Sequence, residues 1–254
     1  MVFDFNQFEL QAEEKAKPVA AEVFLSEVRG VQDRTKIAVQ NPTKKFDTQE
    51  LFGSMTVPSS WQLDSDNSNS GGGYRHTFNY PNQDVELAVS GRNAPLSDKD
   101  GKSFHKLLTD NPDLRNSKVL YDKSWDTDPK FKDDPARQQA LKEMMKNLTN
   151  VLGPSHMGDN QFVNRAGPTD KYAPAFHVDR LELKNVNGKT VLAAEGYFVN
   201  NKTGKPSSHF SGIFAEKRTE GGSIVNQISL QSGDKFAHEA NRLTYEKTLK
   251  SVTW

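Results

Sequence analysis

The sequence predicts an α+β fold in which an antiparallel sheet is flanked by helices. Four segments of alternating apolar residues, separated by short turns, fill the last third of the chain and are typical of an antiparallel meander. A single amphipathic segment follows this meander. The first half repeats the order loosely, with strand-like segments before a helix. Strands in a run followed by helices indicate α+β rather than a parallel, doubly wound sheet.

The meander covers residues 178–230. Asn187-Gly188 is a strong two-residue hairpin signal, because both residues tolerate the positive φ that such a turn requires. We expect the four strands at 178–186, 191–199, 210–216 and 224–230. The helix expected at 234–249 offers five side chains to cover the sheet: Phe236, Ala240, Leu243, Tyr245 and Leu249.

Residues 50–153 predict shorter strands and two helices. The strands are expected at 55–57, 74–80, 85–89 and 119–125. Ser97 is suited to cap a helix that ends before Pro112, since a serine side chain accepts a hydrogen bond from a free backbone N–H group. Asp134-Pro135 begins a second helix, whose apolar stripe consists of Leu141, Met144, Met145, Leu148, Val151 and Leu152.

We expect one main α+β domain at residues 50–254, preceded by an N-terminal arm at 1–45. The arm is helix-prone and is expected to be partly flexible, as terminal segments commonly are. The domain carries a long insertion at about 112–174. Its last part, 153–174, is rich in Gly, Pro, Asn and Asp and indicates a loop, and loops of that length are often functional or disordered.

The composition excludes several classes of site and partner. Lys plus Arg and Asp plus Glu each number 33, and a formal net charge of zero predicts no nucleic-acid partner. The absence of cysteine rules out disulfides, thiolate nucleophiles and cysteine-bound metals. No stretch approaches the ~18 apolar residues of a membrane span, and no secretory signal is recognisable. We therefore expect a cytoplasmic protein by default, with non-classical export and the oligomeric state left open.

Two segments carry a family resemblance. The first runs from Thr56 to Trp61 (TVPSSW) and is followed, after a polar loop, by a strand rich in Phe and Tyr and by Pro95-Leu96-Ser97. The second is the closing segment YEKTLKSVTW at 245–254. Together with the meander and the final helix they resemble the PsbP/Mog-type family over roughly residues 50–254. The insertion and the arm depart from the family pattern.

The resemblance implies an α/β/α sandwich. It also implies binding rather than catalysis, because members of that group act mostly by binding other proteins and share no catalytic residues. The group includes photosystem lumenal proteins, a Ran-binding protein and bacterial proteins of unknown or chaperone-like function.

The candidate binding residues are His156, Asp159, Arg165, His177, Asp179 and His209. The first three lie in the 153–174 loop, where such side chains suit anion binding or acid–base chemistry. His177 and Asp179 lie two residues apart on an expected strand, so we expect them to share a face, with His209 on a later strand near them. No HExxH, GxSxG or phosphate-loop motif is present, and the sequence predicts no catalytic residue, metal or cofactor.

Three functional hypotheses remain open. The first is a non-catalytic module that binds another protein through a sheet face or the long loop. The second is a metal-dependent or acid–base enzyme centred on the 153–180 loop and strand. The third is a secreted effector or accessory factor recognised through its N-terminal arm.

Overall fold

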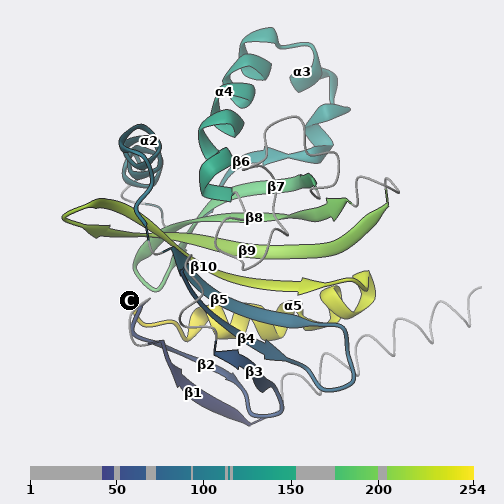
Figure 1. The fold of residues 1–254 in the computed structure, drawn as a ribbon. Helices are drawn as coiled ribbons and strands as arrows, with labels where there is room; N and C mark the ends of the chain where they lie inside the picture. Colours follow the sequence, from purple (N-terminus) through teal and green to yellow (C-terminus); the bar gives the residue numbers. More distant parts are fainter. Residues whose placement is uncertain are drawn as a thin grey trace, which may run out of the picture.

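The computed structural model describes residues 42–48, 52–66, 73–92, 94–111, 114, 117–152, 175–199 and 205–254. Within these ranges the protein is a mixed α and β structure dominated by an eight-stranded antiparallel sheet in the order β3-β4-β5-β10-β9-β8-β7-β6 (Figure 1). The strands are β3 (Gln62–Asp66), β4 (Gly73–Asn79), β5 (Glu86–Arg92), β6 (Lys118–Asp122), β7 (Ala175–Val186), β8 (Lys189–Val199), β9 (Pro206–Thr219) and β10 (Gly222–Ser232). A separate hairpin consists of β1 (Thr43–Asp47) and β2 (Ser54–Pro58).

The predicted meander forms one half of this sheet. β7, β8, β9 and β10 pair in sequence order, and Asn187 and Gly188 turn the chain between β7 and β8 with φ angles of 49° and 87°. Strands β3, β4 and β5 are joined to it by pairing between β10 and β5, in which Ile228 lies opposite Val89, and β6 pairs with β7 at the other edge. Apart from the strand predicted at 55–57, which is β2 of the separate hairpin, the predicted strands are therefore parts of a single sheet.

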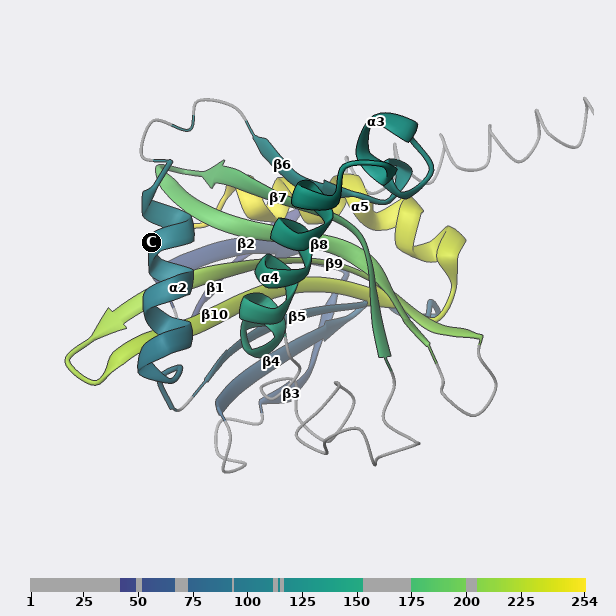
Figure 2. The same ribbon diagram turned by 90° about the horizontal axis from the view of Figure 1, so that it is seen from above.

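Strand β8 shows why the sheet is covered on both sides. Val191 and Ala193 pack into one buried cluster, whereas Leu192 and Ala194 pack into the other. Successive side chains of a strand point to opposite faces, so a stretch that is apolar at consecutive positions, as at 191–194, needs a partner on each face. Figure 2 shows helices α2 (Asp98–Thr109) and α4 (Pro135–Leu152) in front of the sheet and helix α5 (Lys235–Lys250) behind it.

Helices α2 and α4 begin where the sequence predicts. The Ser97 side chain accepts a hydrogen bond from the backbone N–H of Asp100 at 3.2 Å, and Pro135 is the first residue of α4. Phe104 and Leu108 of α2 and Leu148 and Val151 of α4 are buried against the sheet. A short 3-10 helix, η1 (Lys123–Asp126), and helix α3 (Pro129–Lys132) connect β6 to α4.

Helix α5 covers the opposite face, but not with all the residues expected. The prediction for Phe236 and Leu243 is wrong, since they are 70% and 43% exposed. The buried stripe instead consists of Ala237, His238, Ala240, Asn241, Thr244, Tyr245, Thr248 and Leu249. Polar residues can take such positions when hydrogen bonds satisfy them, as when Asn241 Nδ2 donates to the Ala237 carbonyl at 2.8 Å.

The expected N-terminal arm, insertion and loop are described only in part. Residues 1–41 of the expected arm and the 153–174 loop lie outside the described residues, while the last residues of the expected arm belong to β1, which begins at Thr43. Within the expected insertion, β6 is an edge strand of the main sheet. No helix in the described part of the chain has the length and apolar character needed to cross a membrane.

Candidate functional site

Among the described residues, the part of the α5 side of the sheet beside the helix carries charged and aromatic side chains. Helix α5 packs on β9, β10 and β2, and its Arg242 side chain reaches Glu195 of β8. We call the neighbouring surface the polar face. It consists of Asp122 and Lys123 after β6, His177, Asp179, Arg180, Glu182 and Lys184 of β7, Glu195 and Tyr197 of β8, His209 of β9, and His238 and Arg242 of α5.

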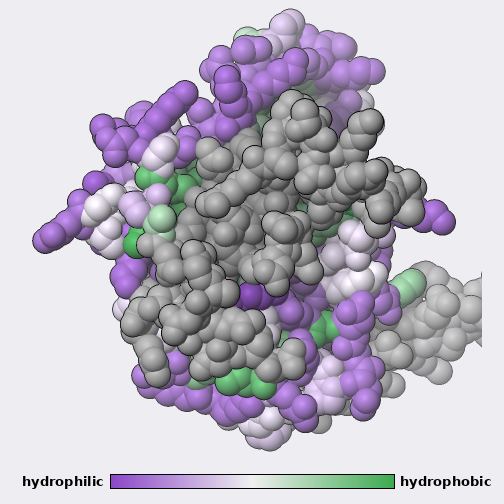
Figure 3. Space-filling model, in the orientation of Figure 1, coloured by the Kyte–Doolittle hydropathy of each residue, from purple (hydrophilic) through white to green (hydrophobic). Residues whose placement is uncertain are grey.

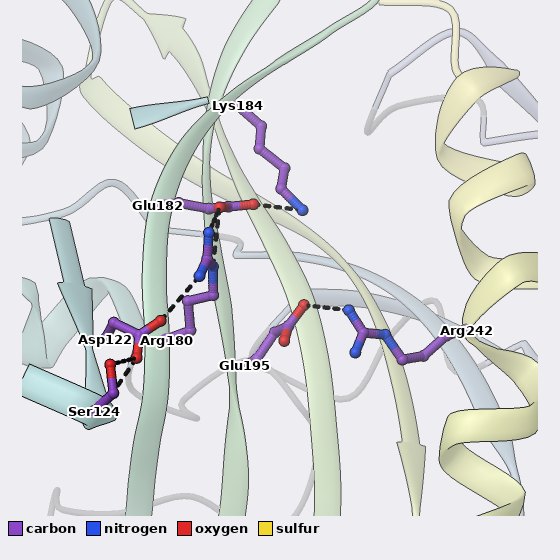
Figure 4. A network of polar contacts seen from close by, with 7 residues as sticks. All are labelled: Asp122, Ser124, Arg180, Glu182, Lys184, Glu195 and Arg242. Carbon is purple, nitrogen blue, oxygen red and sulfur yellow. Dashed lines mark hydrogen bonds and ion pairs between the residues drawn. The ribbon is translucent and has the colours of Figure 1, made fainter. Parts of the chain in front are cut away.

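Strand β7 supplies a ladder of alternating charge along this face. Arg180, Glu182 and Lys184 are spaced by two residues, so their side chains point to the same side of the sheet. Arg180 donates from Nε and Nη2 to Oε2 of Glu182 at 3.1 and 2.9 Å, and Lys184 Nζ lies 2.6 Å from Oε1 (Figure 4). The Glu182 side chain is 7% exposed and is held between two cations.

Three further ion pairs extend the ladder to neighbouring elements. Nη1 of Arg180 reaches Oδ2 of Asp122 at 2.9 Å, which ties β7 to the end of β6. Arg242 extends from α5 to Oε1 of Glu195 at 3.0 Å, which ties the helix to β8 (Figure 4). Lys123 Nζ lies 2.9 Å from Oδ1 of Asp179. These ion pairs therefore hold the residues of the polar face in place through contacts among β6, η1, β7, β8 and α5.

Hydrogen bonding favours the charged forms of Asp122 and Lys123. Hydrogen bonds from the hydroxyl and N–H of Ser124 lower the pKa of Asp122, and Arg180 adds to this. The hydrogen bond with Asp179 raises the pKa of Lys123. Burial lowers the pKa of Lys184, but the carboxylates of Glu195 and Glu246 oppose that shift.

A row of rings crosses the polar face from β7 to α5. The His177 ring lies parallel to Tyr197, with centroids 5.3 Å apart and an interplanar angle of 7°. Tyr197 is followed by His209 at 6.4 Å, and His209 by His238 at 6.1 Å. The row begins at the exposed His177 and ends at the buried His238, where burial lowers the imidazole pKa to about 4.

The structure places three of the six predicted site residues on this face. His177 and His209 do not touch, because Tyr197 lies between them. A β-bulge between Val178 and Arg180 breaks the simple alternation assumed for His177 and Asp179, so Arg180 lies opposite Glu195. In the described ranges, no three His, Asp or Glu side chains form a group that could hold a metal ion. His156, Asp159 and Arg165 lie outside these ranges, and their role stays a prediction.

Sequence reasoning missed the charged ladder although a signal for it exists. Arg180, Glu182 and Lys184 alternate with the apolar Leu181 and Leu183, a pattern that predicts one charged and one buried side of the strand. Glu195 and Tyr197 continue the pattern on β8. Arg242 could not be assigned in this way, because its contact with Glu195 depends on how α5 lies across the sheet.

No protein-family model matches this chain, and neither does any curated protein. The polar face is therefore interpreted from its own chemistry. Asp122, Asp179, Glu182 and Glu195 each accept from a cation, which presents a surface of mixed charge with fixed geometry.

Proposed function

We propose that the protein is a non-catalytic binding protein that holds a partner protein against the polar face. One observation carries the proposal: the charged side chains are fixed by mutual ion pairs yet keep about a third of their surface exposed. The exposed fractions are 38% for Arg180, 36% for Lys184 and 37% for Arg242. Preorganised groups of this kind lose little conformational freedom on association.

The partner that suits this face has mixed charges and hydrogen-bonding groups of its own. Cations and carboxylates alternate across the ladder. Their charges largely cancel at long range, so we expect them to determine how a bound partner is aligned rather than how fast it arrives. Aromatic side chains are the second component of the polar face. His177 and Tyr197 are a stacked pair next to Lys123, whose Nζ lies 5.3 Å from the Tyr197 centroid, and aromatic residues are enriched among binding hot spots.

The paired state of the carboxylates supports binding over acid–base chemistry on this face. A general base needs a proton-accepting group that is free to reach a substrate. The alternative of an enzyme centred on 153–180 depends on His156, Asp159 and Arg165, and that of recognition through an arm depends on residues 1–45. Both remain hypotheses that mutation or deletion of these segments would test.

We further propose a relationship to the PsbP/Mog-type sandwich. The packing of α5 on one face of an antiparallel sheet and of α2 and α4 on the other supports it. An experimental structure, superposed on members of that family over residues 50–254, provides the test. A different strand order in the family members would refute the relationship.

Site-specific photocrosslinking tests the binding proposal. The changes His177→p-benzoylphenylalanine and Gln139→p-benzoylphenylalanine place the probe at exposed positions on the polar face and on α4, respectively. In cells that make the protein natively, position 177 is expected to give a discrete crosslinked partner that position 139 does not. An ordinary solvated sheet face predicts the same products, or none, at both positions.

Two matched lysine variants then test whether the charges of the polar face contribute to binding. Lys123–Asp179 at 2.9 Å and Lys106–Asp110 at 2.8 Å are both exposed Lys–Asp pairs, but only the first belongs to the polar face. Exposed pairs contribute little to stability, so Lys123→Glu and Lys106→Glu should both fold. We expect Lys123→Glu alone to weaken binding of the crosslinked partner, measured by biolayer interferometry with the purified partner. Equal affinities for the two variants would contradict the proposal.

A further inference from the structure

A pocket of about 550 Å³ lies between edge strand β6, η1, α3 and α4. We call it the α4 pocket. It is lined by Lys118, Val119, Leu120, Trp125, Asp126, Phe131, Lys132, Arg137, Gln138, Ala140, Leu141, Lys142 and Met144. Its volume is within the range of about 300–1,000 Å³ that is typical of small-molecule sites.

The inner surface of the pocket is apolar and partly aromatic. Trp125 of η1 and Phe131 of α3 stack with centroids 4.8 Å apart and an interplanar angle of 6°. Leu141 and Met144 of α4 and Leu120 of β6 are half-buried against the hydrophobic core beneath. Such a surface suits a flat apolar group, because stacking and burial stabilise it together.

The charged groups that line the pocket are mostly cations. Lys118, Lys132, Arg137 and Lys142 line it, against a single carboxylate, Asp126. That carboxylate already accepts a hydrogen bond from the Tyr121 hydroxyl at 2.9 Å. Burial and the contact with Asp126 raise the pKa of Tyr121 to about 12, so this donor stays protonated at neutral pH.

Arg137 belongs both to the cations of the pocket and to its aromatic surface. Its guanidinium lies 3.8 Å from the Phe131 centroid and 4.7 Å from the Trp125 centroid. In the described part of the chain no carboxylate forms an ion pair with Arg137, Lys132 or Lys142. The surface of α3 and α4 visible in Figure 3 is mostly hydrophilic.

From this charge complementarity we propose that the α4 pocket binds a small organic anion whose flat apolar body lies against Trp125 and Phe131 and whose carboxylate, sulfonate or phosphate meets Arg137 and Lys142. A guanidinium offers several N–H donors in one plane, which suits an oxyanion. A neutral ligand of the same shape would offer these donors no charged acceptor. The inference does not depend on the polar face or on its partner.

The probe for this proposal is 8-anilinonaphthalene-1-sulfonate, compared with the neutral N-phenyl-1-naphthylamine, which has the same rings. Fluorescence titration of the full chain should give one sulfonate site per molecule. Arg137→Met should weaken the sulfonate about tenfold, the effect of losing one charge-assisted hydrogen bond. The same variant should leave the neutral compound at least as tightly bound, because the apolar stem remains.

Two lysines one turn apart on α4 provide the matched control. Lys142 lines the pocket and Lys146 does not, so Lys142→Met should weaken the sulfonate and Lys146→Met should not. Ala140→Trp, at an exposed position that lines the pocket, should abolish binding of both probes by filling it. Circular dichroism establishes that each variant is folded, since loosely packed states also bind this dye.

Several outcomes would overturn the proposal. Multiple sulfonate sites per chain, or equal loss of affinity in Lys142→Met and Lys146→Met, would show non-specific adsorption. Unchanged binding in Ala140→Trp would place the site elsewhere. If Arg137→Met does not fold, the comparison of Lys142→Met with Lys146→Met tests the proposal without it.

Discussion

At the scale of single residues, His238 gives the fold a defined pH dependence. It lies on the buried face of α5, where burial lowers its pKa, His209 on β9 and Arg242 on α5 add to that effect, and Glu239 opposes it. Its pKa falls from 6.5 to about 4. Between these values the unfolded chain binds a proton that the folded protein does not, so stability is fully present above pH 6.5 and is lost as the pH falls toward 4.

Replacing His238 should remove this dependence. The shift corresponds to about 3 kcal/mol of unfolding free energy lost across that pH range. In His238→Phe, the free energy of unfolding from urea titrations at pH 7, 6, 5 and 4 should fall less steeply than in the parent protein. Identical slopes for the two proteins would mean that His238 does not remain neutral in the fold.

The residue scale also shows where sequence reasoning reaches its limit. Spacing correctly indicates that β7 and β8 have two different sides, but it cannot locate a bulge such as the one between Val178 and Arg180. Neither could it exclude Phe236 from the buried stripe of α5. Apolar character alone does not determine helix phase when buried Asn241 and Thr244 compete for the same face.

At the scale of elements, Asn187 has a second role beyond its turn. The turn itself is predictable, because Asn-Gly suits the positive φ of both central residues. The Asn187 side chain, however, also donates from Nδ2 to the carbonyls of Lys250 and Val252 at 2.9 and 2.7 Å. Lys250 is the last residue of α5 and Val252 follows it, and the backbone acceptors at a helix end have no partner within the helix.

The two roles of Asn187 can be separated by two variants. Asn187→Gly keeps the positive φ and loses only the side-chain contacts, which we expect to cost about 1 kcal/mol. Asn187→Ala loses the contacts and also strains the turn, so about 2 kcal/mol is expected. Chemical denaturation measures both values. Equal stability of Asn187→Gly and the parent protein would show that the link to α5 contributes nothing.

Elements with strong local signals are predictable and those without them are not. The caps of α2 and α5 and the proline at the start of α4 all mark their helices in the sequence. By contrast, β1 (TKKFD) and β3 (QLDSD) are short and polar, and they are strands only because a neighbour pairs with them. The α4 pocket is also not predicted, since Met144 belongs to the apolar stripe of its helix and residue 125 to an expected strand.

At the scale of the whole molecule, pairing between distant segments completes the fold. The β5–β10 pairing joins residues 86–91 to 226–231, and no local pattern encodes that choice. The closing segment 251–254 makes a comparable link to the β1–β2 hairpin. Ser251 Oγ accepts from the Thr56 N–H at 2.8 Å, and the Thr253 backbone exchanges hydrogen bonds with Gly53 and Ser54, both at 2.8 Å.

Trp254 connects the closing segment to the main sheet. Its Nε1 donates to the Val186 carbonyl at 2.6 Å, its ring lies 5.6 Å from that of Phe52, and Lys189 Nζ lies 4.8 Å from its centroid. The segment therefore joins the small hairpin to the β7–β8 turn. Gly53 belongs to the same arrangement, because a Cβ there would lie 2.5 Å from Oγ1 of Thr253.

Deleting residues 251–254 should release the β1–β2 hairpin while the central sheet stays folded. Two backbone–backbone hydrogen bonds and the bond from the Thr56 N–H to the Ser251 side chain are lost, at about 1 kcal/mol each, so we expect a cost of about 3 kcal/mol or more. Hydrogen–deuterium exchange should accelerate at residues 43–58 and remain slow in β8, β9 and β10, because local opening follows the contacts that are removed. Lys250→Ala, at an exposed position beside the segment, is the control and should change neither region. Unchanged exchange at 43–58 after the deletion would show that the hairpin is held by its apolar contacts, Met55 and Val57 above all, rather than by the closing segment.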